Sequence, residues 1–292
     1  MKKLLILSGK GGTGKTTISS AFIEFSKAKA FADCDVDAPN LDLIINPKEA
    51  PKETKFYGSK KAKIDVDKCV KCGKCKEICR FGAIKKNKNG FYIDEYSCEG
   101  CGACTIKCPA NAIKLEDDEA GKLKLYEGER SFSTAKLKMG RGNSGKLVTE
   151  VKEQLNIKNK EKEINENAII DGSPGIGCPV IASITGVDFV LIVTEPSVSG
   201  ISDMKRIIKT VEKFRIKLAV CINKYDNCIE KSLEIEEYLK NNNIQFVGKI
   251  SYDKIILDTI NKQENIANIE CKAKEEIKEV YNNTMKLLNN WK

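Results

Sequence analysis

A glycine-rich stretch near the amino end, LSGKGGTGKTT at residues 7–17, restricts the possible folds of this chain more than any other feature. It fits the pattern G-x-x-x-x-G-K followed by Ser or Thr, which joins a buried strand to a helix through a tight loop. An apolar run at residues 3–7 precedes it, and the helix-compatible segment GKTTISSAFIEFSKA follows. Backbone amides in such a loop surround phosphate groups at the helix N-terminus. The stretch therefore predicts a nucleotide-binding strand, loop and helix.

The same pattern assigns expected roles to residues of the loop. We expect Lys15 to reach the β and γ oxygens of ATP, and the Thr16 hydroxyl to ligate Mg²⁺. Lys10 is one lysine more than the pattern requires. The predicted nucleotide-binding residues are Gly11, Gly12, Thr13, Gly14, Lys15, Thr16 and Thr17.

Short apolar runs separated by helical segments predict the fold of most of the chain. Residues 202–214 and 227–241 place apolar side chains three and four positions apart, as helices covering a sheet do. We therefore predict an α/β fold with a doubly wound, mostly parallel sheet. The runs that suit strands buried on both faces are residues 3–7, 167–170, 189–193, 218–222 and 245–250.

A cysteine-rich segment interrupts this alternation. From about Pro47 to Glu119 no comparable apolar strand occurs, and lysine-rich and acidic stretches flank the segment. We predict an inserted domain at residues 59–118, with residues 1–58 and 119–292 forming the nucleotide-binding domain.

The predicted insert contains an internal repeat. Residues 64–86 return as residues 93–115, and in each half the cysteines follow C-x2-C-x2-C-x3-C. This run binds a 4Fe–4S cluster through three cysteines and sends the fourth to the neighbouring cluster. Two clusters are therefore predicted, one held by Cys69, Cys72, Cys75 and Cys108, the other by Cys98, Cys101, Cys104 and Cys79.

Structural zinc is the alternative for these cysteines. Zinc sites normally separate two C-x-x-C pairs by a dozen or more residues, so the spacing favours the clusters. Over about 55 residues the stretch resembles the bacterial two-cluster ferredoxins, which implies an α+β ferredoxin-like fold. Arg80 departs from that family's motif, because the matched position in the second half is Pro109.

Composition limits the compartment and the chemistry. The chain has thirteen cysteines but no apolar run of the roughly 18 residues that would cross a membrane, and no recognisable export signal. We therefore expect a cytoplasmic protein that uses cysteine for metal or redox chemistry. Histidine is absent, so ligands must be sulfur or oxygen. The net charge of +9 is interpreted as a solvated surface rather than a nucleic-acid site.

The full loop KGGTGKTT resembles the deviant phosphate-binding loop of the MinD, ParA, Mrp and nitrogenase iron protein group of ATPases. In that family the extra lysine reaches across a dimer to the partner's ATP, which implies a catalytic role for Lys10. The local alternative is a lysine paired with a nearby carboxylate. The resemblance covers most of residues 1–46 and 143–292.

Further residues are assigned by the same resemblance. Asp33 would lie near Mg²⁺, Asp35 would orient or activate the attacking water, and Asp171 would bind Mg²⁺-bound water in a switch segment. Asn223 resembles the residue that hydrogen-bonds adenine. Surface carboxylates in a turn are the alternative for Asp33 and Asp35, and an Asn that caps a strand end is the alternative for Asn223.

The combination resembles the ferredoxin-containing ATPases of the MinD superfamily, often labelled after cobyrinic acid diamide synthase. It implies a slow Mg²⁺-dependent ATPase of anaerobic metabolism that forms a homodimer, or a heterodimer with a paralogue, in the ATP state. Two mechanisms follow: electron transfer to a client protein, or assembly of an iron–sulfur or metal cofactor on it.

Another class is a ParA/MinD-like positioning or regulatory ATPase with a redox-sensing ferredoxin module. It needs a terminal amphipathic helix for a membrane or DNA, and residues 274–291 do carry an apolar stripe. We expect the stripe to pack on the sheet instead, which argues against membrane and nucleic-acid partners. Its members are Ile277, Val280, Tyr281, Met285, Leu288 and Trp291.

The cysteines outside the repeat are expected to pack as small apolar residues. Cys178 also has a sharper interpretation, a labile metal or thiol site that meets its mate across a dimer. Packing is assigned as well to Cys34, Cys221, Cys228 and Cys271.

Overall fold

The computed structural model describes residues 2–162 and 167–290, and it divides into two compact units. The larger unit comprises Met1–Glu53, Leu123–Lys136 and Ser144–Lys292. The smaller unit comprises Thr54–Lys122 and Leu137–Asn143. The predicted insert boundaries, residues 59 and 118, both fall inside the smaller unit.

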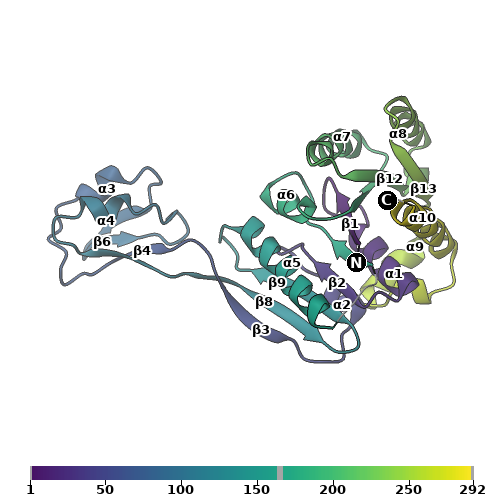
Figure 1. The fold of residues 1–292 in the computed structure, drawn as a ribbon. Coiled ribbons are helices and arrows are strands. Elements are labelled where there is room, and N and C mark those ends of the chain that lie inside the picture. Colours follow the sequence, from purple (N-terminus) through teal and green to yellow (C-terminus); the bar gives the residue numbers. More distant parts are fainter. Residues whose placement is uncertain (1, 163–166, 291–292) are drawn as a thin grey trace. The chain divides into compact units, whose positions relative to one another are not determined.

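Among the described residues the main sheet has nine strands in the order β13-β12-β11-β1-β10-β2-β9-β8-β3 (Figure 1), most of them in the larger unit. Every neighbouring pair from β13 to β9 is parallel. The strands are β1 (Lys3–Ser8), β2 (Ala30–Asp33), β3 (Lys52–Tyr57), β8 (Glu119–Glu127), β9 (Ser131–Leu137), β10 (Ala168–Asp171), β11 (Phe189–Thr194), β12 (Lys217–Asn223) and β13 (Gln245–Ile250).

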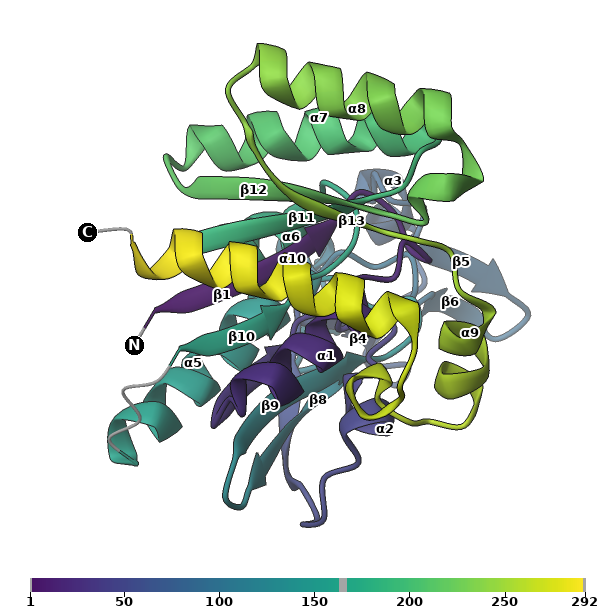
Figure 2. The same ribbon diagram turned by 90° about the vertical axis from the view of Figure 1, so that its right-hand side faces the viewer.

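Helices cover both faces of this sheet. Figure 2 shows α1 and α10 on one face, and α5, α6 and α7 cover the other. The predicted α/β fold is therefore confirmed. The helices are α1 (Lys15–Ser26), α2 (Leu41–Ile45), α5 (Ser144–Glu161), α6 (Cys178–Ile184), α7 (Val198–Lys213), α8 (Ile229–Asn241), α9 (Lys254–Asn261) and α10 (Lys272–Asn289), with 3-10 turns at Tyr225–Asn227 and Ile266–Asn268.

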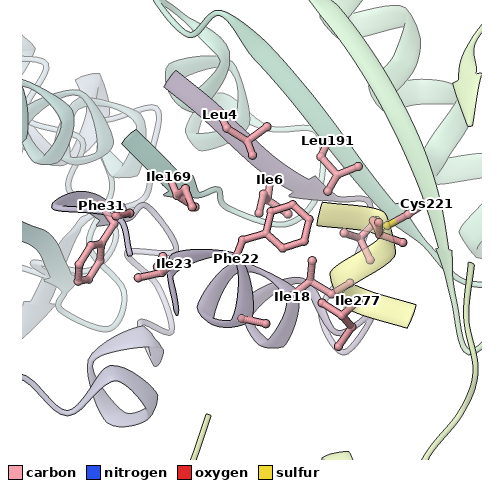
Figure 3. Packing of buried hydrophobic residues seen from close by; sticks show 14 of the residues in the cluster. Leu4, Ile6, Ile18, Phe22, Ile23, Phe31, Ile169, Leu191, Cys221 and Ile277 are labelled. Atoms are coloured by element: carbon pink, nitrogen blue, oxygen red, sulfur yellow. The ribbon is translucent and has the colours of Figure 1, made fainter. Parts of the chain in front are cut away.

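The core lies between the sheet and the α1–α10 layer (Figure 3). Leu4 and Ile6 of β1 face Phe22 of α1 and Ile277 of α10, because alternate strand residues point to the same face. Leu5 and Leu7 are also fully buried, so both faces of β1 are covered, as its continuous apolar run predicted.

The C-terminal apolar stripe packs within the molecule, as predicted. Ile277, Val280 and Leu288 are buried in the core, with Tyr281 and Met285 packed against it. Trp291 lies outside the described residues. Among the described residues no helix is long and apolar enough to cross a membrane.

The smaller unit has its own sheets and core. β4 (Lys61–Ile64) pairs antiparallel with β7 (Ile113–Glu116), and β5 (Ile84–Asn87) with β6 (Gly90–Ile93). The short helices α3 (Lys74–Ile78) and α4 (Ala103–Lys107) begin at matched positions of the two repeats. β4 lies near the start of the cysteine-rich segment and β7 near its end, so this sheet is formed by strands from both ends of the segment.

Candidate functional site

The glycine-rich loop joins β1 to α1, as predicted, and glycine is required at its end. Gly12 and Gly14 adopt φ of 80° and 90°, where a side chain is strained. A Cβ on Gly14 would also lie 2.3 Å from Nδ2 of Asn223. The turn at Gly14 directs the first backbone amides of α1 toward the loop, the arrangement that binds phosphate at a helix N-terminus.

A buried ion pair lies beneath this loop. Lys15 Nζ contacts Asp171 Oδ1 at 2.7 Å, while Thr16 Oγ1 donates to Asp171 Oδ2 and Ser19 Oγ to Asp171 Oδ1, each at 2.8 Å. Burial lowers the pKa of Lys15, but the charges of Asp171 and Asp33 outweigh it and the pKa is raised. Lys15 is therefore a charged ammonium held inside the protein.

A second carboxylate stands beside this pair. Asp33 ends β2 and is in register with Asp171 at the end of β10. Its Oδ1 accepts from the Asp35 amide at 2.9 Å, and its Oδ2 accepts from the Asn40 and Leu41 amides, each at 3.1 Å. Burial and the charge of Asp171 raise the pKa of Asp33 to about 7. The fully buried side chain is not the surface carboxylate of the alternative interpretation.

Asp35 follows in the same loop and is partly buried. Burial is the largest cause of its raised pKa, and the charge of Lys15 opposes the shift. Together with Thr16, the three carboxylates place several oxygen donors around Lys15, and oxygen is the ligand type that Mg²⁺ takes.

Lys10 has a carboxylate partner in its own chain. Its Nζ lies 2.6 Å from Glu195 Oε1 and donates to Ser199 Oγ at 2.9 Å and Ser197 Oγ at 3.3 Å. These partners lie at the end of β11 and the start of α7. The single chain thus contains the local pairing that the sequence left open, with the Lys10 side chain 35% exposed.

Asn223 contacts the loop rather than the surface. Its Nδ2 donates to the Thr13 carbonyl at 2.7 Å, from the end of β12. The next residue, Lys224, donates to the Gly12 carbonyl at 2.9 Å and was missed by sequence reasoning. Its position directly after Asn223 in the strand-ending CINK was the available signal. The Asn223 and Lys224 side chains therefore fix the backbone of the glycine-rich loop through hydrogen bonds to its carbonyls.

The eight repeat cysteines line two cavities in the smaller unit. Cys79, Cys98, Cys101 and Cys104 line one cavity, and Cys69, Cys72, Cys75 and Cys108 line another. These are the two predicted quartets, each with the fourth cysteine from the other repeat. Burial raises the pKa of the Cys75 and Cys104 thiols, and neighbouring cysteines add to the shift.

The prediction that Cys178 packs as a buried residue is wrong. Cys178 is exposed, because it is the first residue of α6 and the buried face of that helix begins at Val180. Cys34 and Cys221 are buried as predicted, while Cys228 and Cys271 are half-buried.

Comparison with known proteins identifies the family. The model of the CobQ/CobB/MinD/ParA nucleotide binding domain matches residues 4–266. Two uncharacterized proteins of Methanocaldococcus jannaschii are similar over most of their length. MJ0578 is 33% identical, covering 96% of this chain and 95% of its own, and MJ0579 is 34% identical, covering 91% of each. The chain belongs to the CobQ/CobB/MinD/ParA family.

Two further likenesses describe the parts of this MinD-type protein. The crystal structure of the cell division ATPase MinD of Pyrococcus furiosus has a TM-score of 0.57 at 15% identity, covering 98% of this chain and 99% of that one. At this identity the likeness shows the fold alone. The pyruvate synthase subunit PorD of M. jannaschii is 49% identical over 57 residues, 19% of this chain and 66% of that protein. The predicted combination of a MinD-type ATPase domain with a ferredoxin-like module is confirmed.

Proposed function

We propose that this MinD-type protein hydrolyses ATP with Mg²⁺ and that its nucleotide state acts on two 4Fe–4S clusters. ATP turnover is thereby coupled to electron transfer to a client protein, or to iron–sulfur or metal-cofactor assembly on it. Membership of an ATPase family and the ferredoxin likeness support the two halves of the proposal. The coupling between them rests on contacts within this chain.

The loop residues and carboxylates have distinct roles in the proposal. Lys15 neutralises the phosphates, and Thr16, Asp33 and Asp171 hold Mg²⁺ directly or through water. Asp35, the least buried of the three carboxylates, orients the attacking water. Lys10 acts on the ATP of a second subunit, and Asn223 positions the loop backbone or the base.

The eight cysteines suit clusters better than zinc. A zinc ion needs four thiolates that converge on one point. Among the described residues no three Cys, Asp or Glu side chains form such a single-ion site, and each quartet surrounds a cavity instead. Backbone amides of Ala62 and Ala112 donate to the sulfurs of Cys98 and Cys108, the hydrogen bonding that tunes a cluster. Bound clusters would supply one-electron chemistry.

The Asp33 carboxylate carries the proposal of coupling. Its Oδ2 accepts hydrogen bonds from the amides of Asn40 and Leu41, so it holds the start of α2 (Leu41–Ile45). After α2 the chain reaches Thr54, the first residue of the smaller unit. A change in Mg²⁺ coordination that alters the hydrogen bonds of Asp33 therefore acts on the segment that leads to the cysteine-rich unit.

The chain that leaves the smaller unit contacts the helix that follows Asp171 in the sequence. α5 begins at Ser144, directly after the smaller unit, and Lys152 within it donates to carbonyls at the end of α6, those of Ala182 at 2.9 Å and Ser183 at 2.7 Å. α6 itself begins seven residues after Asp171. Two of the four chain connections of the smaller unit, those at Thr54 and Ser144, thus lead to elements that follow or contact elements near the residues that we propose to sense the nucleotide.

A redox titration with nucleotides tests the coupling. The protein is purified without oxygen, and its reduced clusters are followed by EPR with no nucleotide, with ADP and with a non-hydrolysable ATP analogue. We expect the signal or the midpoint potential to change with the nucleotide in the wild type. The Lys15→Gln variant, with unaltered cysteines, should show the same clusters with no nucleotide response. A loaded wild-type protein that responds to neither nucleotide contradicts the coupling.

The partner in the ATP state is a second copy or a paralogue. MJ0578 and MJ0579 come from one organism and are similarly related to this chain, which supports a pair of paralogues. Mixing two tagged forms of this protein with ATP and analysing the mixed species tests the homodimer directly. Absence of a mixed species at saturating ATP favours the paralogue.

A further inference from the structure

The two repeats of the smaller unit differ in charge although their cysteines match. Residues 69–80 contain four basic residues and one acidic residue, whereas the matched residues 98–109 contain one of each. The difference lies between the cysteines: Lys71, Lys74 and Lys76 stand where the second repeat has Gly100, Ala103 and Thr105. Each repeat therefore serves as an internal comparison for the other.

Ion pairs neutralise other basic residues of the smaller unit but leave this group. On the strands, Lys63 pairs with Glu116 at 3.1 Å and Lys85 with Asp94 at 2.6 Å. Among the described residues no carboxylate lies within ion-pair distance of the basic loop, and its members are all exposed. We define the basic loop as Lys71, Lys74 and Lys76.

The basic loop lies at one of the two cysteine-lined cavities. Lys71 lines the cavity of Cys69, Cys72, Cys75 and Cys108, whereas the other cavity has Glu99 in its lining. The linings of two otherwise matched cavities therefore differ in charge, with a lysine in one and a glutamate in the other.

Lys71 occupies a backbone position that disfavours a lysine. Its φ is 56°, and the matched Gly100 has a φ of 65°, a conformation that glycine adopts without strain. The side-chain stem of Lys71 runs past Gly90, with Cε 3.5 Å from where a Cβ on that glycine would lie. A strained residue that exposes a charge beside a functional cavity indicates a use for that charge.

We propose that the basic loop is the docking surface for an acidic electron-carrier protein. The proposal rests on the proposed function, in that the adjacent cavity holds a cluster. A positive patch steers an acidic partner and sets its orientation, and here it brings that partner to one particular cavity. Docking itself makes and breaks no covalent bond.

Nucleic acid fits this surface less well than an acidic protein. A long polyanion follows an extended basic surface. Residues 91–122 of the same unit carry seven acidic and three basic residues, so positive charge does not extend evenly over the unit. A compact acidic protein needs only such a local patch.

Transplanting the second repeat's residues tests the surface while preserving the fold. The variant Lys71→Gly/Lys74→Ala/Lys76→Thr places in the first loop the residues that already occupy matched positions in the second. The control Lys209→Ala/Lys213→Ala/Lys278→Ala removes three exposed lysines from helices of the larger unit. Both variants keep all eight repeat cysteines, and iron and sulfide analysis establishes their cluster content.

Binding is measured with a purified, strongly acidic two-cluster ferredoxin as probe. We expect calorimetry at low salt to show about tenfold weaker binding for the transplant, from three surface charge contacts, and wild-type affinity for the control. The difference should vanish near 1 M salt, where the screening length is about 3 Å. Carbodiimide cross-linking should join the basic loop to carboxylates of the probe.

Several results would overturn the docking proposal. These are equal affinity of the transplant and the wild type, no binding of the loaded wild type at low salt, or tighter binding of a single-stranded oligonucleotide than of the ferredoxin. Failure of the proposed function can be distinguished from failure of docking. It appears as a protein without iron and sulfide, or as clusters whose EPR signal and midpoint potential do not change with the nucleotide.

Discussion

The two interpretations of Lys10 make opposite predictions for one neighbouring residue. In the single chain, Lys10 pairs with Glu195 at 2.6 Å and donates to Ser199. If Lys10 functions through this pairing, Glu195→Gln removes the interaction on which that function depends. If Lys10 instead acts on the ATP of a second subunit, Glu195 competes with that role, and Glu195→Gln frees the lysine.

The size of the competition follows from exposure. The two side chains are 35% and 20% exposed, so solvent screens the pair, and it is worth about 0.2–1 kcal/mol. A homodimer releases two such pairs, so Glu195→Gln should tighten ATP-dependent dimerisation by about 2- to 30-fold. Lys10→Ala removes two desolvated contacts of about 2 kcal/mol or more each, which weakens the dimer roughly 1000-fold.

Sedimentation velocity over a concentration series with Mg²⁺ and ATP measures these changes. An Asp35→Ala background slows hydrolysis and should trap the dimer. Lys213→Ala, which removes an exposed lysine of α7, is the control and should dimerise like the wild type. A Lys10→Ala protein with wild-type dimerisation, or a weaker dimer with Glu195→Gln, would refute the role of Lys10 across the dimer.

Further predictions concern the buried pair, the loop and the smaller unit. Asp171→Ala leaves the buried ammonium of Lys15 without this partner and should lower the free energy of unfolding by about 3–5 kcal/mol in urea titrations; a loss below about 1 kcal/mol contradicts the prediction. Gly14→Ala places a Cβ on a residue with φ 90°, 2.3 Å from the side-chain nitrogen of Asn223, and should lower the midpoint of urea unfolding. Gly11→Ala, whose Cβ would have no atom within 4 Å, should leave the midpoint unchanged. Equal midpoints of the two variants would contradict the predicted crowding at Gly14. Hydrogen bonds from two lysines lower the pKa of Glu119 to about 2, so its contribution to stability is complete above the unfolded pKa of about 4.5 and is lost as the pH falls toward 2. Glu119→Gln should remove this part of the pH dependence, and thermal melts with the same acid sensitivity in both proteins would count against it.

Strands with a continuous run of large apolar residues were predictable, and strands with few such residues were not. The predicted run at 189–193 is β11 (Phe189–Thr194), and the run at 245–250 is β13. β2 was not among the predicted runs because Phe31 is its one large apolar residue, and β9 because its serines and threonines carry no apolar signal, although both strands are buried in the sheet. Burial of such residues depends on neighbours that a local pattern does not contain.

The contacts of the site depended on residues far apart in the chain. Asp33 and Asp171 come together because β2 and β10 are paired in register. The contacts of Asn223 with Thr13 and of Lys10 with Glu195 arise because loops at the carboxyl ends of parallel strands meet at one edge. Cys178 was misjudged because exposure at the start of a helix depends on which face that helix buries.

The phosphate-binding loop and the two cysteine quartets could be assigned from the chain alone. Their geometry depends on short spacings, since a glycine-rich turn and a C-x2-C-x2-C-x3-C run are shaped by residues within a few positions. Only the tertiary structure decided which charges pair and which remain exposed. It buried Lys15 with Asp171, gave Lys10 a partner in its own chain, and left the basic loop without a carboxylate partner among the described residues, at one of two matched cavities. Electrostatic partners are set by distances and burial across the fold, which sequence separation does not reveal.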